Sequence, residues 1–310
     1  MEFRQLSYFI AVVDTGSISA ASRQVHVAQP ALTRQIQVLE EDLGTLLLER
    51  HARGVSPTVA GKALYEEAIQ LLDTRTRIRT RLSALGQGLI GKVSLGVTVT
   101  HLWEPEVAAL LKNYRDRYSK VAFEVYPLLS APQLERLREG SLDVGILYLD
   151  GGDQPGLETR LLQKDHLVLA VPENSHWSAS PPQRLAELRD ADFVWGFRSV
   201  SPVYFDRVMA HFERLGFAPK VVQYGADNTT ILSMVAAGLG VAIVPSASIA
   251  CRMPGVSFLS FEELSACDMP LWMAWRPTNQ SPALRNLLQL AETAFNPAEG
   301  PGNFSPQTQP

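Results

Sequence analysis

The stretch TGSISAASRQVHVAQPALTRQIQVLEEDLG, residues 15–44, decides how the chain begins to fold. A single long helix would keep proline out of its middle, yet His-Val-Ala-Gln-Pro at 26–30 separates two short helical patterns. Ser17 stands where it can cap a helix of about nine residues, and Pro30 suits the first turn of the next helix, where its missing N–H costs nothing. The sequence therefore predicts two helices joined by a sharp corner.

A further helix is expected before this pair. Apolar residues at 3, 6, 9, 10 and 13 recur at spacings of three and four, which indicates one buried helix face ending at 14–16. After the corner, the inward stripe of the next helix is Leu32, Ile36, Leu39 and Leu43. Helix, corner and helix form the helix-turn-helix arrangement, whose second helix lies in the DNA major groove.

The outward face of the second helix carries groups that can read bases. Glutamine can pair with adenine, arginine with guanine, and threonine can offer its hydroxyl or its methyl group. These groups are Gln29, Thr33, Arg34 and Gln37. The alternative is a solvated polar face on a structural helix, which is the commoner meaning of such a pattern taken alone.

The segment after Gly44 favours DNA binding. LLLERHARGVSPT predicts a strand, a turn at 52–54 and a return strand that ends at Pro57, with Arg50, His51 and Arg53 near the turn. An arginine-tipped hairpin beside a helix-turn-helix is a wing, which can reach the phosphate backbone or the minor groove. The predicted DNA-binding residues are Ser17, Gln29, Pro30, Thr33, Arg34, Gln37, Arg50 and Arg53.

Residues 3–64 resemble the N-terminal domain of the LysR-type transcriptional regulators. The first helix, the corner, the proline-started reading helix, the arginine wing and Thr-x-x-Gly at the next helix occur in order without a gap. Ala28 departs from the serine of many members, so that helix lacks a capping side chain worth about 1 kcal/mol. The resemblance implies a regulator that binds double-stranded promoter DNA as a homodimer or homotetramer, with RNA polymerase as a further partner.

Thr58 can cap a long helix over residues 59–85. Apolar positions along it alternate steps of four and three, which is the heptad seam of paired helices. The seam consists of Leu64, Ala68, Leu71, Arg75, Ile78, Leu82 and Leu85, of which Arg75 interrupts the apolar run and lowers its stability. The stripe could instead pack on the protein's own body. In the LysR-type family the equivalent helix is the dimerising linker.

Beyond the glycines at 86, 88 and 91, strands and helices alternate in a βαβαβ order that implies a parallel sheet. A second set of strands and helices follows and predicts a second lobe. The chain is expected to cross between the two lobes near residues 162–168 and again near 265–270. This arrangement resembles the two-lobed, periplasmic-binding-protein-like effector domain of the same family. The expected fold is α/β with an N-terminal all-α winged helix-turn-helix. The expected domains are the DNA-binding domain 1–58, the linker helix 59–88, the effector domain 89–296 (lobe I 89–163 and 268–296, lobe II 164–267) and a disordered tail 297–310.

Ligands of open α/β sheets bind beyond the carboxyl ends of the strands, where helix N-termini point N–H groups at them. Three such places carry hydroxyl groups, which suits a small organic anion; the residues could equally be helix caps. The predicted effector-binding residues are Thr98, Thr100, His101, Ser130, Phe197 and Ser201.

Composition narrows the class of protein. The net charge is −4, with 10 basic against 9 acidic residues in 1–90 and 18 against 23 in 91–310, so charge alone does not indicate a nucleic-acid partner. Two cysteines give no disulfide framework or metal spacing, and no secretory signal or membrane span is expected, which predicts a cytoplasmic protein. A solute-binding or transport protein is the alternative for the lobes. An enzyme is disfavoured because no catalytic motif or metal cluster is present, so no catalytic residue, metal or cofactor is predicted.

Overall fold

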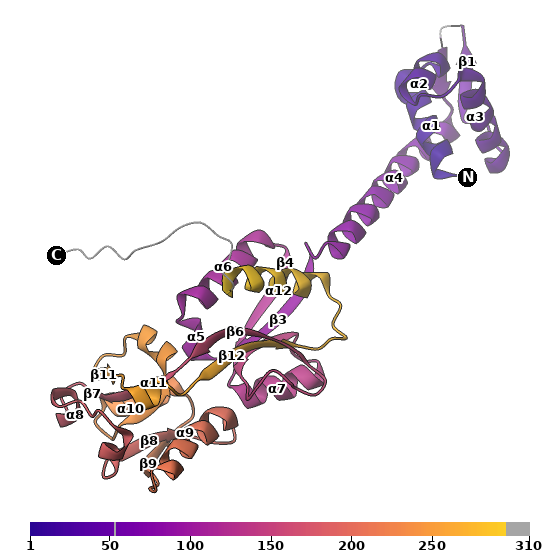
Figure 1. The fold of residues 1–310 in the computed structure, drawn as a ribbon. Helices are drawn as coiled ribbons and strands as arrows, with labels where there is room; N and C mark the ends of the chain where they lie inside the picture. Colours follow the sequence, from indigo (N-terminus) through magenta and orange to yellow (C-terminus); the bar gives the residue numbers. More distant parts are fainter. Residues whose placement is uncertain (53, 296–310) are drawn as a thin grey trace. The chain divides into compact units, whose positions relative to one another are not determined.

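The computed structural model describes residues 1–52 and 54–295, which form two compact units, Met1–Ala84 and Leu85 onward (Figure 1). Arg53 of the predicted DNA-binding set and the tail 297–310, predicted to be disordered, lie outside the described residues. No helix in the described ranges combines the length and the apolar character that a membrane span requires.

Three helices build the core of the first unit: α1 (Phe3–Thr15), α2 (Ile18–Gln24) and α3 (Gln29–Leu43). Phe9, Leu32 and Leu39 meet there with no exposed surface. Ser17 caps α2 as predicted, because its hydroxyl oxygen accepts the Ala20 amide at 3.3 Å. The prediction that Leu43 points inward is wrong: it is the last residue of α3, directly before the left-handed Gly44, and it is exposed.

The expected wing is present as the antiparallel strands β1 (Leu48–His51) and β2 (Gly54–Pro57). Glu40 fixes its base to α3, since its Oε1 accepts the amides of Leu47 and Leu48 at 2.7 and 3.1 Å. The Val55 amide also donates to the carbonyl of Gly16 at 3.0 Å. The wing is thus held against both α3 and the corner between α1 and α2.

Helix α4 (Val59–Gly86) begins inside the first unit. Thr58 caps it by accepting the Gly61 amide at 2.9 Å, as expected. The predicted seam divides into two parts. Leu64 packs against the core of the first unit and Ala68 is buried, whereas Leu71, Arg75, Ile78, Leu82 and Leu85 are exposed. Packing on the protein's own body therefore accounts for the start of the stripe only.

A five-stranded sheet forms the first lobe of the second unit, in the order β4-β3-β5-β12-β6. The strands are β3 (Gly91–Val97), β4 (Val121–Pro127), β5 (Val144–Tyr148), β6 (Glu158–Asp165) and β12 (Met269–Trp275). Strand β3 runs parallel to β4 and β5 as predicted, but β12 is antiparallel to β5 and β6. The parallel arrangement predicted from the βαβαβ order is confirmed for β3, β4 and β5. Strand β12, whose direction was not predicted, enters from the opposite end after the chain has passed through the second lobe.

Helices cover both faces of this sheet (Figure 1). Helices α6 (Pro105–Arg117) and α12 (Pro282–Phe295) lie together on one face, and α7 (Ser130–Glu139) lies on the other. The short helix α5 (Val99–Leu102) begins where the first strand was expected to continue, so Thr98 stands at a strand-to-helix corner.

The second lobe is formed by the residues between the two crossings, at 165–167 and 265–269. Strand β7 (Leu167–Pro172) pairs antiparallel with β10 (Ala242–Pro245) and β11 (Val256–Leu259), while β8 (Asp192–Gly196) pairs parallel with β9 (Lys220–Gly225). The helical elements are α8 (His176–Ala179), η1 (Leu185–Leu188), α9 (Pro202–Arg214), α10 (Asn228–Ala236), η2 (Ser246–Cys251) and α11 (Glu262–Ser265).

Candidate functional sites

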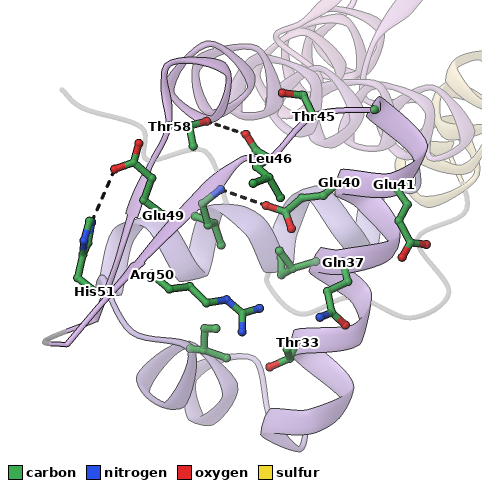
Figure 2. Close-up of a pocket in the computed structure, with 14 residues that line it drawn as sticks. Thr33, Gln37, Glu40, Glu41, Thr45, Leu46, Glu49, Arg50, His51 and Thr58 are labelled. Atoms are coloured by element: carbon green, nitrogen blue, oxygen red, sulfur yellow. Dashed lines mark hydrogen bonds and ion pairs between the residues drawn. The ribbon is translucent and has the colours of Figure 1, made fainter.

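A groove of about 1060 Å³ lies between α3 and the wing in the first unit (Figure 2). Thr33, Gln37 and Glu41 line it from α3, and Glu49, Arg50 and His51 line it from β1. The Arg50 side chain extends from β1 into this groove toward Gln37 and Thr33, as Figure 2 shows. A residue assigned to the wing and two assigned to the reading helix therefore share one surface.

The charged members of the predicted DNA-binding set are available to an external partner. Arg34 and Arg50 are exposed, and among the described residues neither guanidinium makes a hydrogen bond or an ion pair. Three further members of the set are exposed on α3. Gln29 and Pro30 lie in its first turn, and Gln37 lies about two turns further along the helix. Their side chains can meet a ligand without first breaking a contact within the protein.

Two members of the set are already engaged locally. Thr33 is half-buried and donates its hydroxyl to the carbonyl of Gln29 at 3.0 Å, so toward an outside group it can accept or present its methyl. Ser17 caps α2. At the start of α3, Ala28 makes no side-chain capping bond, as its departure from serine implied. The first turn of the reading helix thus keeps unpaired backbone donors.

Two adjoining cavities, of about 40 and 220 Å³, lie between the lobes of the second unit. Thr98, Phe197 and Ser201 line the smaller cavity and Thr100 lines the larger. Phe197 stacks on Tyr224, with ring centroids 5.3 Å apart and planes at 16°. The structure therefore brings four of the six predicted effector-binding residues, from both lobes, to one region.

The other two predicted residues lie behind the cavity wall. Ser130 is buried, and its hydroxyl accepts the Tyr148 amide at 3.3 Å. His101 has no exposed surface and contacts Thr98 through Nδ1. Neither lines either cavity, so each can act on a ligand only through the residues in front of it.

Sequence reasoning missed four polar residues of the cavity: Tyr148, Tyr204, Asp227 and Asn228. Asn228 donates its Nδ2 to the hydroxyl of Thr100 at 2.8 Å, which joins the two lobes. Asp227 caps α10 by accepting the Thr230 amide at 2.8 Å. The pair follows β9 directly and begins a helix, which is the same strand-to-helix signal that identified the other three places.

A chain of buried hydrogen bonds leads from the cavity to the first crossing. His101 Nε2 lies 2.9 Å from the hydroxyl of Tyr148, which donates to Asp165 Oδ2 at 2.7 Å. The other oxygen of Asp165 accepts the hydroxyl of Ser246 and the amide of His166, the latter at 2.7 Å. Burial lowers the pKa of His101 to about 4, against a smaller opposing effect of Asp165. His101 is therefore neutral near pH 7, and burial together with Asp165 raises the pKa of Tyr148 well above its ordinary value.

Glu104, close to this crossing, is a carboxylic acid with a strongly raised pKa. Burial raises its pKa to about 7, with further raising by Asp165 and Glu106, while the Gln163 amide at 2.8 Å acts in the opposite direction. Its other oxygen, Oε2, is buried without a hydrogen-bond partner among the described residues. No group of three or more His, Cys, Asp or Glu side chains in the described ranges is placed to hold a metal ion.

Two known protein families match this chain, one for each unit. Residues 3–62 match the family described as "Bacterial regulatory helix-turn-helix protein, lysR family", and residues 86–296 match "LysR substrate binding domain". The transcriptional regulator TfdS of Cupriavidus pinatubonensis is 32% identical over 94% of this chain and 98% of its own length. ClcR of Pseudomonas putida, also a transcriptional regulator, has the same identity and the same coverage of both chains.

Solved structures give the same assignment for the whole chain. The crystal structure of CbnR, a LysR family transcriptional regulator, is 31% identical, covers 94% of this chain and 100% of its own, and superposes with a TM-score of 0.77. CbnR complexed with its target DNA gives 30% identity, coverage of 95% and 100%, and the same TM-score. These relatives are regulators rather than enzymes, in agreement with the sequence prediction. The chain therefore belongs to the LysR family of bacterial helix-turn-helix transcriptional regulators.

Proposed function

We propose that this regulator binds promoter DNA through α3 and the wing as a homodimer, or a pair of dimers, and responds to a small organic anion between the lobes. In this proposal residues 1–58 read DNA, 59–88 link two copies, and 89–296 bind the effector, with lobe I at 89–163 and 268–296 and lobe II at 164–267. RNA polymerase is the partner that such a regulator would address, and the bacterial cytoplasm is where both promoter and polymerase are found.

The shared groove of α3 and the wing is the observation that carries the DNA proposal. Arg34 and Arg50 are exposed without a partner among the described residues, while Gln29 and Gln37 present amide groups on the same helix. Arg34 and the glutamines would contact base edges, and Arg50, with Arg53 as predicted, would contact phosphates. Ser17, Pro30 and Thr33 would set the position of the helix ends that approach the backbone.

A salt-titrated gel shift with the DNA upstream of the chain's own gene tests this division of roles. Arg34→Ala should lose about 1–3 kcal/mol of preference for the specific site over competitor DNA. Arg50→Ala should weaken binding to all sequences alike and reduce the slope of log affinity against log salt by about 1. Arg115→Ala, which removes an exposed arginine from α6, is the control. Equal losses of preference from Arg34→Ala and Arg50→Ala would contradict the assigned roles.

The exposed part of the α4 seam supports the proposed dimer. Leu71, Ile78, Leu82 and Leu85 leave between 41% and 63% of their surface accessible along one helix. Apolar residues at heptad spacing on a helix face are stabilised by pairing with the same face of a second copy. Two reading heads would then address two halves of a pseudo-palindromic site.

The effector proposal rests on the polar groups that meet at the two cavities. Thr98, Thr100, Ser201 and Asn228 provide uncharged hydrogen-bonding groups, and α9 begins at the cavity wall. The N-terminus of α10, in contrast, is already capped by the cavity residue Asp227. Helix N-termini and hydroxyl groups can hold a carboxylate. Leu129, Val200 and Ile231 supply an apolar wall for the rest of a small molecule.

Calorimetry with benzoate and benzamide, which differ in charge but little in shape, tests the predicted charge of the ligand. Benzoate should bind more tightly to the native protein, and Thr100→Val should remove the preference while leaving affinity for DNA unchanged. Equal binding of the two probes would refute the anion, and loss of DNA binding in Thr100→Val would refute the separation of the two sites.

A further inference from the structure

The buried hydrogen-bond chain behind the cavity has a fixed direction. The hydroxyl of Tyr148 donates its one proton to Asp165 Oδ2 at 2.7 Å, so that proton is not available to His101. The bond between His101 Nε2 and the Tyr148 oxygen must then use the proton of the imidazole. A neutral imidazole with its proton on Nε2 accepts at Nδ1, so the hydroxyl of Thr98 donates there.

Thr98 is the member of this series of hydrogen bonds that lines the cavity. It lines the smaller cavity, and its one hydroxyl proton is committed to His101, so toward a ligand the Thr98 oxygen can accept without any change. A ligand group that itself accepts hydrogen bonds must take the Thr98 proton away from His101. Because His101 is completely buried, its Nδ1 would then lose its hydrogen-bond partner in a place that water does not reach.

The other end of this series of hydrogen bonds, at Asp165, joins the two lobes. Asp165 is the last residue of β6 in the first lobe, and Ser246 follows β10 in the second. The hydroxyl of Ser246 donates to Asp165, and the amide of Ser246 donates to the carbonyl of His166 at 2.8 Å. Asp165 is 5% exposed, and its three neutral donors, from Tyr148, His166 and Ser246, come from three separate parts of the fold.

We propose that Thr98, His101, Tyr148, Asp165 and Ser246 form a proton-ordered relay through which an acceptor group of the effector at Thr98 weakens the attachment between the lobes. His101 and Tyr148 act in it as positioning residues. The relay rests on the proposed effector site and adds a direction to it: a ligand that accepts from Thr98 disturbs the chain, whereas one that donates to Thr98 leaves the chain intact.

Hydrogen–deuterium exchange of the full-length protein, read by mass spectrometry without any ligand, tests the relay. The reporters are peptides covering 160–170 and 243–250, which contain the amides of His166 and Ser246. Thr98→Val removes the first hydroxyl and should speed exchange in both peptides about threefold. Thr98→Ser keeps the hydroxyl and should restore the native rate. Tyr148→Phe, which removes the bond to Asp165 itself, should speed exchange about tenfold.

Tyr126→Phe is the matched control, because it removes a hydroxyl that donates to Glu124 at 2.6 Å on β4, outside the relay. It should leave both reporter peptides at the native rate. Unchanged exchange at 243–250 in Thr98→Val, or a rise equal to that of Tyr126→Phe, would overturn the relay. Rescue by Thr98→Ser distinguishes the hydrogen bond from a packing defect, since serine lacks the methyl group that valine retains.

A ligand arm separates failure of the relay from failure of the proposed effector. Saturating benzoate should speed exchange at 243–250 in the native protein and add nothing in Thr98→Val. If benzoate binds and exchange at 243–250 does not change, the relay is wrong and the effector site stands. If no binding is detected, the anion proposal loses support, and the ligand-free comparison still decides the relay.

Discussion

Replacement of Glu104 by glutamine should make the second unit more stable at alkaline pH and leave it little changed in acid. Glu104 is 9% exposed at the corner before α6, and burial raises the pKa of its carboxyl group from 4.5 to about 7. Its side chain makes no capping bond to that helix, so glutamine removes a charge without removing a cap. The amide oxygen of glutamine can still accept from Gln163.

The direction of the effect follows from proton binding. Between pH 4.5 and about 7 the unfolded chain has released the Glu104 proton and the folded chain has kept it. The free energy of unfolding therefore falls as the pH rises through this interval, and it stays low above it. The full shift would correspond to about 3 kcal/mol, and we expect about 1.5–2 kcal/mol because the residue is not completely buried. Glu104→Gln should gain this amount relative to the native chain.

His101 changes the pH dependence of stability in the opposite direction. Its contribution cancels when Glu104→Gln is compared with the native chain. Its pKa is lowered from 6.5 to about 4, so the unfolded chain binds a proton that the folded chain refuses, and stability is lost as the pH falls through that interval. Both the native chain and Glu104→Gln contain His101. The difference between them therefore isolates Glu104.

Urea unfolding followed by tryptophan fluorescence measures this difference. All five tryptophans lie between 103 and 275, so the signal reports on the second unit. Glu135→Gln, which changes an exposed carboxylate on α7 that does not act on Glu104, is the control and should show no such gain at alkaline pH. A stability difference between Glu104→Gln and the native chain that stays constant from about pH 5 to pH 8 would refute the reasoning, because Glu104 would then ionise alike in the folded and unfolded states.

Three further substitutions test other contacts. Gly61→Ala should destabilise the first unit by about 1–3 kcal/mol, since a Cβ there would lie 2.0 Å from the carbonyl oxygen of Leu47; an unchanged thermal transition by circular dichroism would contradict that approach. Leu82→Glu should shift the proposed dimer toward monomer in analytical ultracentrifugation, and an association state equal to that of the native chain would exclude this seam as the interface. Asn228→Ala should cost the second unit about 1 kcal/mol in urea by removing the bond to Thr100 between the lobes, and a loss no larger than experimental error would show that the bond contributes nothing.

The elements of the first unit could be predicted closely because local signals determine them. Pro30, the glycines after α1 and α3, and the capping residues Ser17 and Thr58 each act within one turn of the chain. The attachment of the wing by Glu40 was not predictable, since that carboxylate accepts amides seven and eight residues further on.

In the second unit, the features that could not be predicted depend on residues far away along the sequence. Strand β6 is rich in charged residues because it lies at the edge of its sheet, so it lacks the apolar run of a central strand. The direction of β12 depends on the chain's passage through the other lobe. Tyr148 gave no signal as a site residue, because its role depends on His101 and Asp165, which lie 47 residues before it and 17 residues after it.

The burial of Ala68 in the first unit has a consequence for how such regulators can change in evolution. Helix α4 continues without a break from the buried Ala68 into its exposed section. The direction in which the exposed apolar residues point around the helix axis is therefore fixed relative to α1–α3. Inserting one residue into the exposed section would turn the rest of the helix by about 100°. A seven-residue insertion would turn it by only about 20°. Lineages that alter the span between half-sites are therefore expected to lengthen this helix by heptads.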